Sequence, residues 1–183
     1  MLIYNKLLYI AVYLILFIIF KEYNMLHINI ICVGKLKEKY LKDAVDEYSK
    51  RLSKYCSLNI IEIQDEKIPS NENEKNLLEI KKKECEKIIT HIKKDSYVIA
   101  LDLTGNQFSS EEFSEKIQNI SLTNSTITIV IGGSLGMTQE FLKSVDEKIS
   151  FSKMTFPHQL IRVFLLEQLF RAFKIYNNET YHR

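Results

Sequence analysis

Short apolar runs separated by polar breaks repeat along the chain from residue 25 onward. The runs have the length of strands and are rich in Ile and Val, and they alternate with segments whose apolar residues recur every three or four positions, as in amphipathic helices. The predicted strands are 26–33, 58–63, 97–103 and 126–131, with a short fifth strand expected at 149–151. The predicted helices are 37–54, 77–92, one beginning at 109–112, a short one from 138, and 157–176. This alternation predicts an α/β fold with a mostly parallel sheet and helices on both faces.

Glycines and a polar loop follow the predicted strands. They are Gly105, the pair Gly132–Gly133 and the loop 151–156. Ligands of parallel sheets lie beyond the carboxyl ends of the strands, so we expect these segments to gather around one site. Glycine lets a backbone approach a ligand closely, and a loop that ends at a proline leaves main-chain N–H and C=O groups free. A cofactor held largely by main chain is indicated, although a glycine pair after a strand is often only a tight turn.

The last predicted helix carries two polar residues on its apolar face. At 100° per residue, His158 and Arg162 fall among leucines and phenylalanines, one turn apart. A buried guanidinium must meet an acid, a partner subunit or a ligand, so a structural ion pair and an anion or RNA contact both stay open. The helix is apolar nearly all round, and Phe164 lies on its polar face. Covering by a second subunit would explain this, which predicts a homodimer.

Composition narrows the function only slightly. The net charge of +2 does not suggest a nucleic-acid-binding protein, so any RNA contact must come from a local patch. The three cysteines are widely spaced, without a CxxC pair, which argues against a zinc knuckle or a disulfide framework. Reduced thiols in the cytosol are the simplest interpretation.

Residues 1–24 form a separate, apolar extension. Residues 7–20 are 14 consecutive apolar residues, and a helix of this length spans roughly 21 Å, less than the ~30 Å of a bilayer core. No cleavage site for a signal peptide follows. A membrane anchor, an uncleaved signal and a translation start assigned too early are the alternatives. The last is favoured, because an α/β pattern begins at Met25.

The chain ends in Tyr181, His182 and Arg183. An aromatic ring and a guanidinium can stack on nucleobases, and a guanidinium can pair with phosphate. The tail is therefore a candidate substrate-binding segment, with a frayed terminus as the alternative.

Taken together, these motifs closely resemble the RlmH family, over essentially residues 25–183. The stretches that carry the resemblance are Val33-Gly34-Lys35, Leu101-Asp102, Ile131-Gly132-Gly133, Phe151 to His158, Arg162-Val163 and Tyr181-His182-Arg183. The family comprises SPOUT-class enzymes that methylate N3 of a pseudouridine in 23S rRNA of the large ribosomal subunit. The resemblance implies a single methyltransferase domain over residues 25–183, with a C-terminal trefoil knot. It further implies a cytoplasmic homodimer, S-adenosylmethionine (SAM) as methyl donor, and catalysis without a metal.

The resemblance also implies roles for individual residues. The family's SAM contacts correspond to Leu101, Gly132, Phe151, Ser152, Lys153, Met154, Thr155 and Phe156. His158, Arg162 and the tail would face the RNA, with the tail completing the partner subunit's site. The chemistry of N3 methylation adds two further roles: His158 or His182 would accept the N3 proton, directly or through water, and a cation such as Arg162 or Arg183 would stabilise the developing negative charge. Our hypothesis is that Arg162 polarises the base and the tail orients it. Assembled ribosomes are the expected substrate. The alternatives are a SPOUT methyltransferase for another RNA such as tRNA, and a non-catalytic, membrane-tethered SAM- or RNA-binding protein.

Overall fold

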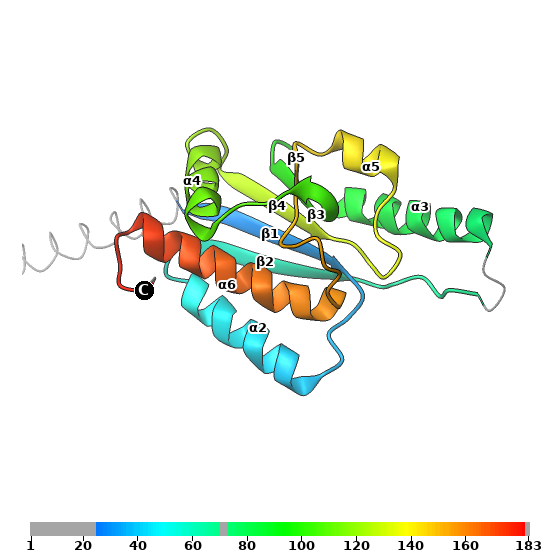
Figure 1. The fold of residues 1–183 in the computed structure, drawn as a ribbon, viewed down its shortest axis with the longest axis horizontal. Helices are drawn as coiled ribbons and strands as arrows, with labels where there is room; N and C mark the ends of the chain where they lie inside the picture. Colours follow the sequence, from blue (N-terminus) through cyan, green and yellow to red (C-terminus); the bar gives the residue numbers. More distant parts are fainter. Residues whose placement is uncertain (1–24, 70–72, 182–183) are drawn as a thin grey trace, which may run out of the picture.

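A computed structural model describes residues 25–69 and 73–181 and shows one sheet of parallel strands (Figure 1). The strands are β1 (Leu26–Val33), β2 (Cys56–Ile63), β3 (Tyr97–Asn106), β4 (Thr126–Ile131) and β5 (Glu147–Ile149), in the order β2-β1-β4-β3-β5. The helices are α2 (Lys39–Leu52), α3 (Glu74–His91), α4 (Ser110–Ser121), α5 (Gln139–Ser144) and α6 (His158–Tyr176). All strand pairs are parallel.

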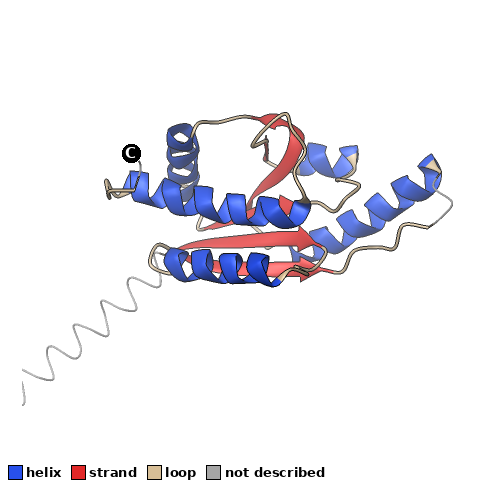
Figure 2. Ribbon diagram, turned by 60° about the horizontal axis from the view of Figure 1, so that its bottom comes forward, coloured by secondary structure: helices blue, strands red, loops and turns tan. Residues whose placement is uncertain are grey.

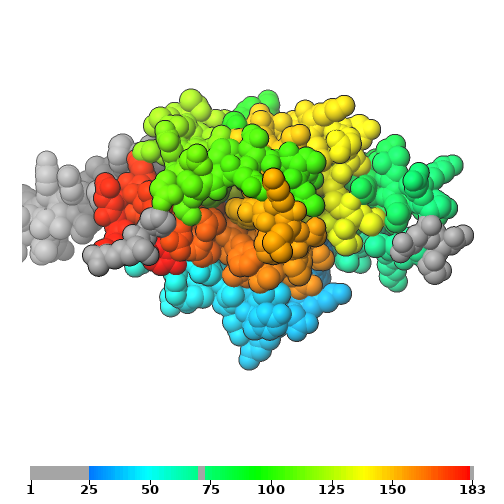
Figure 3. All heavy atoms as spheres, viewed as in Figure 1, coloured from blue at the N-terminus to red at the C-terminus, as the bar shows by residue number. Residues whose placement is uncertain are grey.

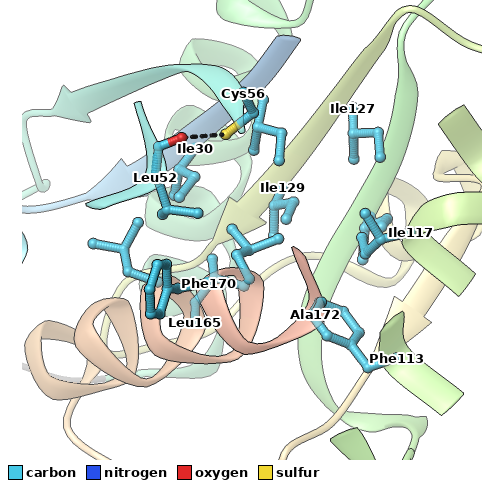
Figure 4. Close-up of a cluster of buried hydrophobic side chains, with 14 of the residues drawn as sticks. Ile30, Leu52, Cys56, Phe113, Ile117, Ile127, Ile129, Leu165, Phe170 and Ala172 are labelled. Atoms are coloured by element: carbon cyan, nitrogen blue, oxygen red, sulfur yellow. Dashed lines mark hydrogen bonds between the residues drawn. The ribbon is translucent and has the colours of Figure 1, made fainter. Parts of the chain in front are cut away.

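Both faces of the sheet are buried, which explains why its strands are continuous apolar runs. Successive residues of β1 alternate between two cores: Ile30 packs with α2, α4 and α6, whereas Ile31 packs with α3 and α5. Figures 1 and 2 show the two helical layers on opposite sides of the sheet, and Figure 4 shows part of the larger core. The predicted α/β fold with helices on both faces is confirmed.

Polar side chains cap the N-termini of α4 and α5 at the positions where the sequence predicts these helices to begin. Ser109 and Glu112 form a capping box, in which the Ser109 hydroxyl accepts the Glu112 N–H and the Glu112 carboxylate accepts the Ser109 N–H. Thr138 accepts the Phe141 N–H at the start of α5. These caps satisfy donors that lack partners within a helix, so they determine where α4 and α5 begin.

The third and fifth strands differ from the prediction. β3 continues to Asn106, and β5 is Glu147–Ile149 rather than 149–151, because the two strands pair with each other. Gly105 therefore lies within β3, away from the loop cluster in which the sequence places it. A Cβ atom on Gly105 would lie 2.5 Å from the Ile149 nitrogen. Glycine is needed here for close backbone packing, not for a ligand.

The apolar character of α6 is explained within the chain. α6 packs against the sheet between α2 and α4, and Leu165, Leu166 and Leu169 are completely buried. A second subunit is therefore not needed to account for most of this helix. Phe164 is the exception, being 39% exposed and in edge-to-face contact with Phe156. The homodimer remains a prediction.

Predictions about residues 1–24 lie outside the described residues. Within the described part of the chain, no helix has the length and apolarity needed to cross a bilayer. The trefoil knot and the domain boundary at residue 25 also remain predictions.

Candidate functional site

A cavity of about 430 Å³ lies at the carboxyl ends of β3, β4 and β5. Three stretches line most of it: 101–104, 131–137, and 149–156 without Lys153. His158 and Ile161 of α6 complete one side, and Lys81 of α3 reaches the cavity from another element. This is the edge at which parallel sheets bind ligands, and the volume suits a small molecule.

The glycine turn after β4 forms one wall of the cavity. Gly136 N–H donates to Gly133 C=O at 3.0 Å, and Gly136 has a φ of +73°. Gly132 is buried, and a Cβ atom on it would lie 3.1 Å from Met137 Cγ. The turn is closed by its own backbone, so its main chain forms the cavity surface.

Serine side chains hold the loop 150–156 in shape on the opposite wall. The Ser150 hydroxyl donates to the Ser152 carbonyl at 2.8 Å, and the Met154 N–H donates to the Ser152 hydroxyl at 3.0 Å. The N–H groups of Phe151, Thr155 and Phe156 make no hydrogen bond to any residue in the described ranges. The loop is therefore a shaped stretch of backbone with donors free for a ligand.

The structure brings together nearly all of the residues predicted to contact the cofactor. Leu101, Gly132, Phe151, Ser152, Met154, Thr155 and Phe156 line the cavity. Lys153 is exposed and does not line it. That these residues bind a cofactor stays a prediction, but the structure shows that they line one cavity.

Arg162 is buried beside the cavity and has partners within its own chain. Its Nη1 lies 2.8 Å from Glu62 Oε1, and its Nη2 donates to the carbonyls of Val33 and Gly34 at 3.0 and 2.7 Å. Arg162 is 2% exposed and does not line the cavity. Of the two alternatives left open by the sequence, the structural ion pair is present.

His158 lies one helical turn before Arg162 and lines the cavity. Burial lowers the pKa of its imidazole below the usual 6.5, the positive charges of Arg162 and Lys37 act in the same direction, and Asp65 opposes them. A neutral imidazole has a lone pair that can accept a proton, so His158 is suited to act as a base near neutral pH.

Tyr181 lies at the other end of α6. Its ring packs edge-on against Phe170, with centroids 5.0 Å apart, and the Arg171 guanidinium lies 4.9 Å from its centre. The helix rises about 18 Å between His158 and Phe170. The structure therefore does not bring Tyr181 to the cavity of its own chain. His182 and Arg183 lie outside the described residues.

With this geometry established, comparison with known proteins identifies the family. A family model described as "Predicted SPOUT methyltransferase" matches residues 26–182. The chain belongs to the SPOUT methyltransferase family. Its resemblance to RlmH proteins is confirmed by relatives named "Ribosomal RNA large subunit methyltransferase H".

Two of these relatives illustrate the similarity. A Clostridium botulinum (strain Hall) protein with that name is 61% identical over 159 residues, which cover 86% of this chain and all of the relative. A Clostridium perfringens (strain SM101) protein, "Ribosomal RNA large subunit methyltransferase H 1", is 60% identical with the same coverage. A solved TrmH/SpoU tRNA-modifying enzyme of A. aeolicus is 13% identical, with a TM-score of 0.47 over 82% of this chain and 77% of its own. That likeness is too distant to carry an argument.

Glu84 is a buried acid next to the site of this SPOUT family member, and it was not predicted from the sequence. The residue is 5% exposed. One carboxylate oxygen accepts the Glu66 N–H at 3.0 Å, and the other lies 3.0 Å from where a Cβ atom of Gly133 would be. It thus packs behind the glycine turn. Helical spacing could have predicted its burial, because Ile80, Glu84 and Ile88 recur every four residues along the buried face of α3.

We expect replacement of Glu84 by glutamine to stabilise the protein at neutral pH. Burial raises the pKa of Glu84, Asp65 and Glu66 act in the same direction, and the Glu66 N–H and Lys87 oppose them. Because the pKa of Glu84 is higher in the folded than in the unfolded state, the contribution of this group to folding stability is present below the unfolded pKa. That contribution is lost as the pH rises through the folded pKa. Glutamine stays neutral and keeps an oxygen that can accept the Glu66 N–H.

Urea unfolding at several pH values tests this expectation. The advantage of Glu84→Gln should be present at pH 7–8 and shrink as the pH falls toward about 4, near the unfolded pKa. Glu86→Gln is the matched control, because Glu86 is exposed on the same helix. A Glu84→Gln protein that is less stable than wild type at pH 7.5 would show that the ionised carboxylate stabilises the glycine turn.

Proposed function

We propose that this protein is a SAM-dependent methyltransferase that methylates N3 of a pseudouridine in the 23S rRNA of large ribosomal subunits, in the cytoplasm. One observation carries the proposal: relatives named as large-subunit rRNA methyltransferases are 60% identical over their whole length. The choice of pseudouridine N3, and of assembled ribosomes as substrate, rests on the resemblance to the RlmH family.

The cavity fits the proposed donor. SAM combines a flat purine, a ribose and a methionine tail, and would supply an electrophilic methyl group on a sulfonium. The free N–H groups of the 151–156 loop suit the polar edge of a purine, and Leu101 and Ile131 offer apolar contact. The turn at Gly132–Gly133 lines the cavity, and a Cβ atom at either glycine would lie close to Met137, Val33 or Glu84, so glycine lets this wall pack tightly against the protein behind it.

The remaining task of the protein is to place the acceptor nitrogen and receive its proton. Methyl transfer is an in-line displacement, so orientation contributes much of the rate. His158 lines the cavity with its pKa lowered, and we assign it the role of proton acceptor for N3–H, directly or through water. Arg162 is engaged with Glu62, so we assign stabilisation of the developing negative charge to Arg183 of the tail.

The tail supports a homodimer with shared sites. Tyr181 packs against Phe170, and about 18 Å of α6 separates Phe170 from His158. The tail, as far as it is described, therefore does not line the cavity of its own chain. We infer that it completes the cavity of a second copy, across a two-fold axis.

Methyl transfer to defined RNAs tests the proposal. The full chain is incubated with labelled SAM and with large subunits or ribosomes from a strain that lacks its own enzyme of this kind. We expect one methyl group on a pseudouridine of 23S rRNA, located by mass spectrometry. Thr155→Trp is the control, since this exposed loop position lines the cavity and tryptophan would fill it. Label in tRNA, or no transfer by a protein that binds SAM, would contradict the proposal. A membrane-tethered binding protein would instead sediment with membranes.

A further inference from the structure

The corner between β1 and α2 carries three exposed lysines that form no ion pair within the described part of the chain. Lys35, Lys37 and Lys39, hereafter the lysine corner, are all exposed. None of them forms an ion pair with a residue in the described part of the chain, and one acid, Glu38, lies among them. The corner is a local positive patch on a protein whose net charge is only +2.

The backbone of this corner is fastened on several sides. Gly34 N–H donates to the Ile63 carbonyl at 2.7 Å, Leu36 N–H to Glu62 at 2.9 Å, and Lys37 N–H to the Gln159 side chain at 3.0 Å. Arg162 binds the Val33 and Gly34 carbonyls. A loop held to β2 and α6 in this way has a fixed backbone, so only the lysine side chains need to become ordered when they bind an anion.

The lysine corner adjoins the candidate site. The His158 Nε2 lies 3.6 Å from where a Cβ atom of Gly34 would be, and the charge of Lys37 is close enough to lower the pKa of His158. In Figure 3 the blue surface of this corner lies beside the orange surface where α6 begins. An anion bound to these lysines would thus lie next to the cavity that the acceptor must enter.

Lys39 is not placed to stabilise α2. Lys39 begins the helix, the N-cap Glu38 makes no side-chain capping hydrogen bond, and the first turn contains no acid. Positive charge at a helix N-terminus opposes the macrodipole and is slightly destabilising. Tyr40, beside Lys39, is 66% exposed and offers a ring on which a base can stack. Exposed lysines next to an exposed aromatic ring suit RNA, whose phosphates and unstacked bases need both.

We propose that the lysine corner binds phosphates of the RNA strand that carries the target base, and so guides that base toward His158. This inference rests on the proposed function and adds the surface by which the substrate is held. Each lysine neutralises one phosphate, so its contribution is electrostatic and independent of sequence. The effect should fall on substrate binding rather than on donor binding.

The double variant Lys35→Gln/Lys37→Gln tests the proposal against Lys93→Gln/Lys94→Gln. The control removes the same charge from exposed lysines that precede β3, at the amino ends of the parallel strands, whereas the lysine corner follows β1 at the carboxyl ends. For large-subunit RNA we expect the first variant to raise KM about tenfold and to reduce the slope of log affinity against log salt by about 1 to 2. The control should match wild type in both, and both variants should keep SAM affinity and oligomeric state.

Other results overturn the inference. Equal changes in the two variants would show a general effect of net charge, and an unchanged KM and salt slope would show that the corner does not touch RNA. Loss of SAM affinity or of dimers in the Lys35→Gln/Lys37→Gln protein would assign the lysines to the fold or to an interface. RNA retention on filters gives the same comparison without catalysis, so the corner is tested even where wild type transfers no methyl group.

Discussion

Replacement of Arg162 by alanine is expected to lower the free energy of unfolding by about 3–5 kcal/mol. The guanidinium is almost completely buried and pairs with Glu62. Its removal leaves the carbonyls of Val33 and Gly34 without their side-chain donor, and each buried polar group left unpaired costs about 1–3 kcal/mol. The three contacts join the ends of β1 and β2 to α6, so the loss should be felt by the whole domain.

Urea unfolding of Arg162→Ala, Arg162→Lys and Arg51→Ala measures this effect. Lysine keeps the charge but cannot reproduce the forked contacts, so Arg162→Lys should recover part of the stability. Arg51 forms an exposed pair with Glu47 one turn away, and its loss should lower the stability far less than the loss of Arg162. An Arg162→Ala protein with wild-type stability, normal SAM affinity and no methyl transfer would instead make Arg162 a group that acts on the substrate.

The elements could be predicted from the sequence because their signals are local. Apolar runs with both faces buried indicate parallel strands, and Ser109 and Thr138 mark helix starts by composition. The strand Thr126–Ile131 matches the prediction at both ends. The errors at β3 and β5 arise from pairing: nothing near residue 105 indicates that the chain near Ile149 will lie against it.

The site could be predicted where it is built from main chain. The glycine turn and the 151–156 loop lie at strand ends, so a parallel sheet brings them together. Gly105 has the same local signal but serves close packing, and sequence cannot separate the two uses. The partner of Arg162 is 100 residues away, and identifying Glu62 requires knowing which strand end faces α6.

Removal of residues 181–183 is expected to reduce methyl transfer by at least about a hundredfold while donor binding persists. The reason is that the tail, as proposed, orients the base and stabilises the negative charge that develops on it. Thr155→Trp should also lose transfer, but through loss of donor binding, since the tryptophan ring would fill the donor cavity. Each variant alone should therefore be nearly inactive. If the tail serves the cavity of a second copy, a mixed dimer of the two variants has one intact site: the unblocked cavity of the truncated chain, completed by the intact tail of its partner.

Equal amounts of the two variants, unfolded together and refolded to exchange chains, should recover about a quarter of the wild-type rate, since half of the dimers are mixed and each has one working site. Wild type refolded in the same way sets the scale, and the two variants refolded separately and then combined set the background. No recovery in a preparation shown by mass spectrometry to contain mixed dimers would mean that the tail serves its own chain. Such a result would require the tail to leave the contact between Tyr181 and Phe170 and fold back along α6.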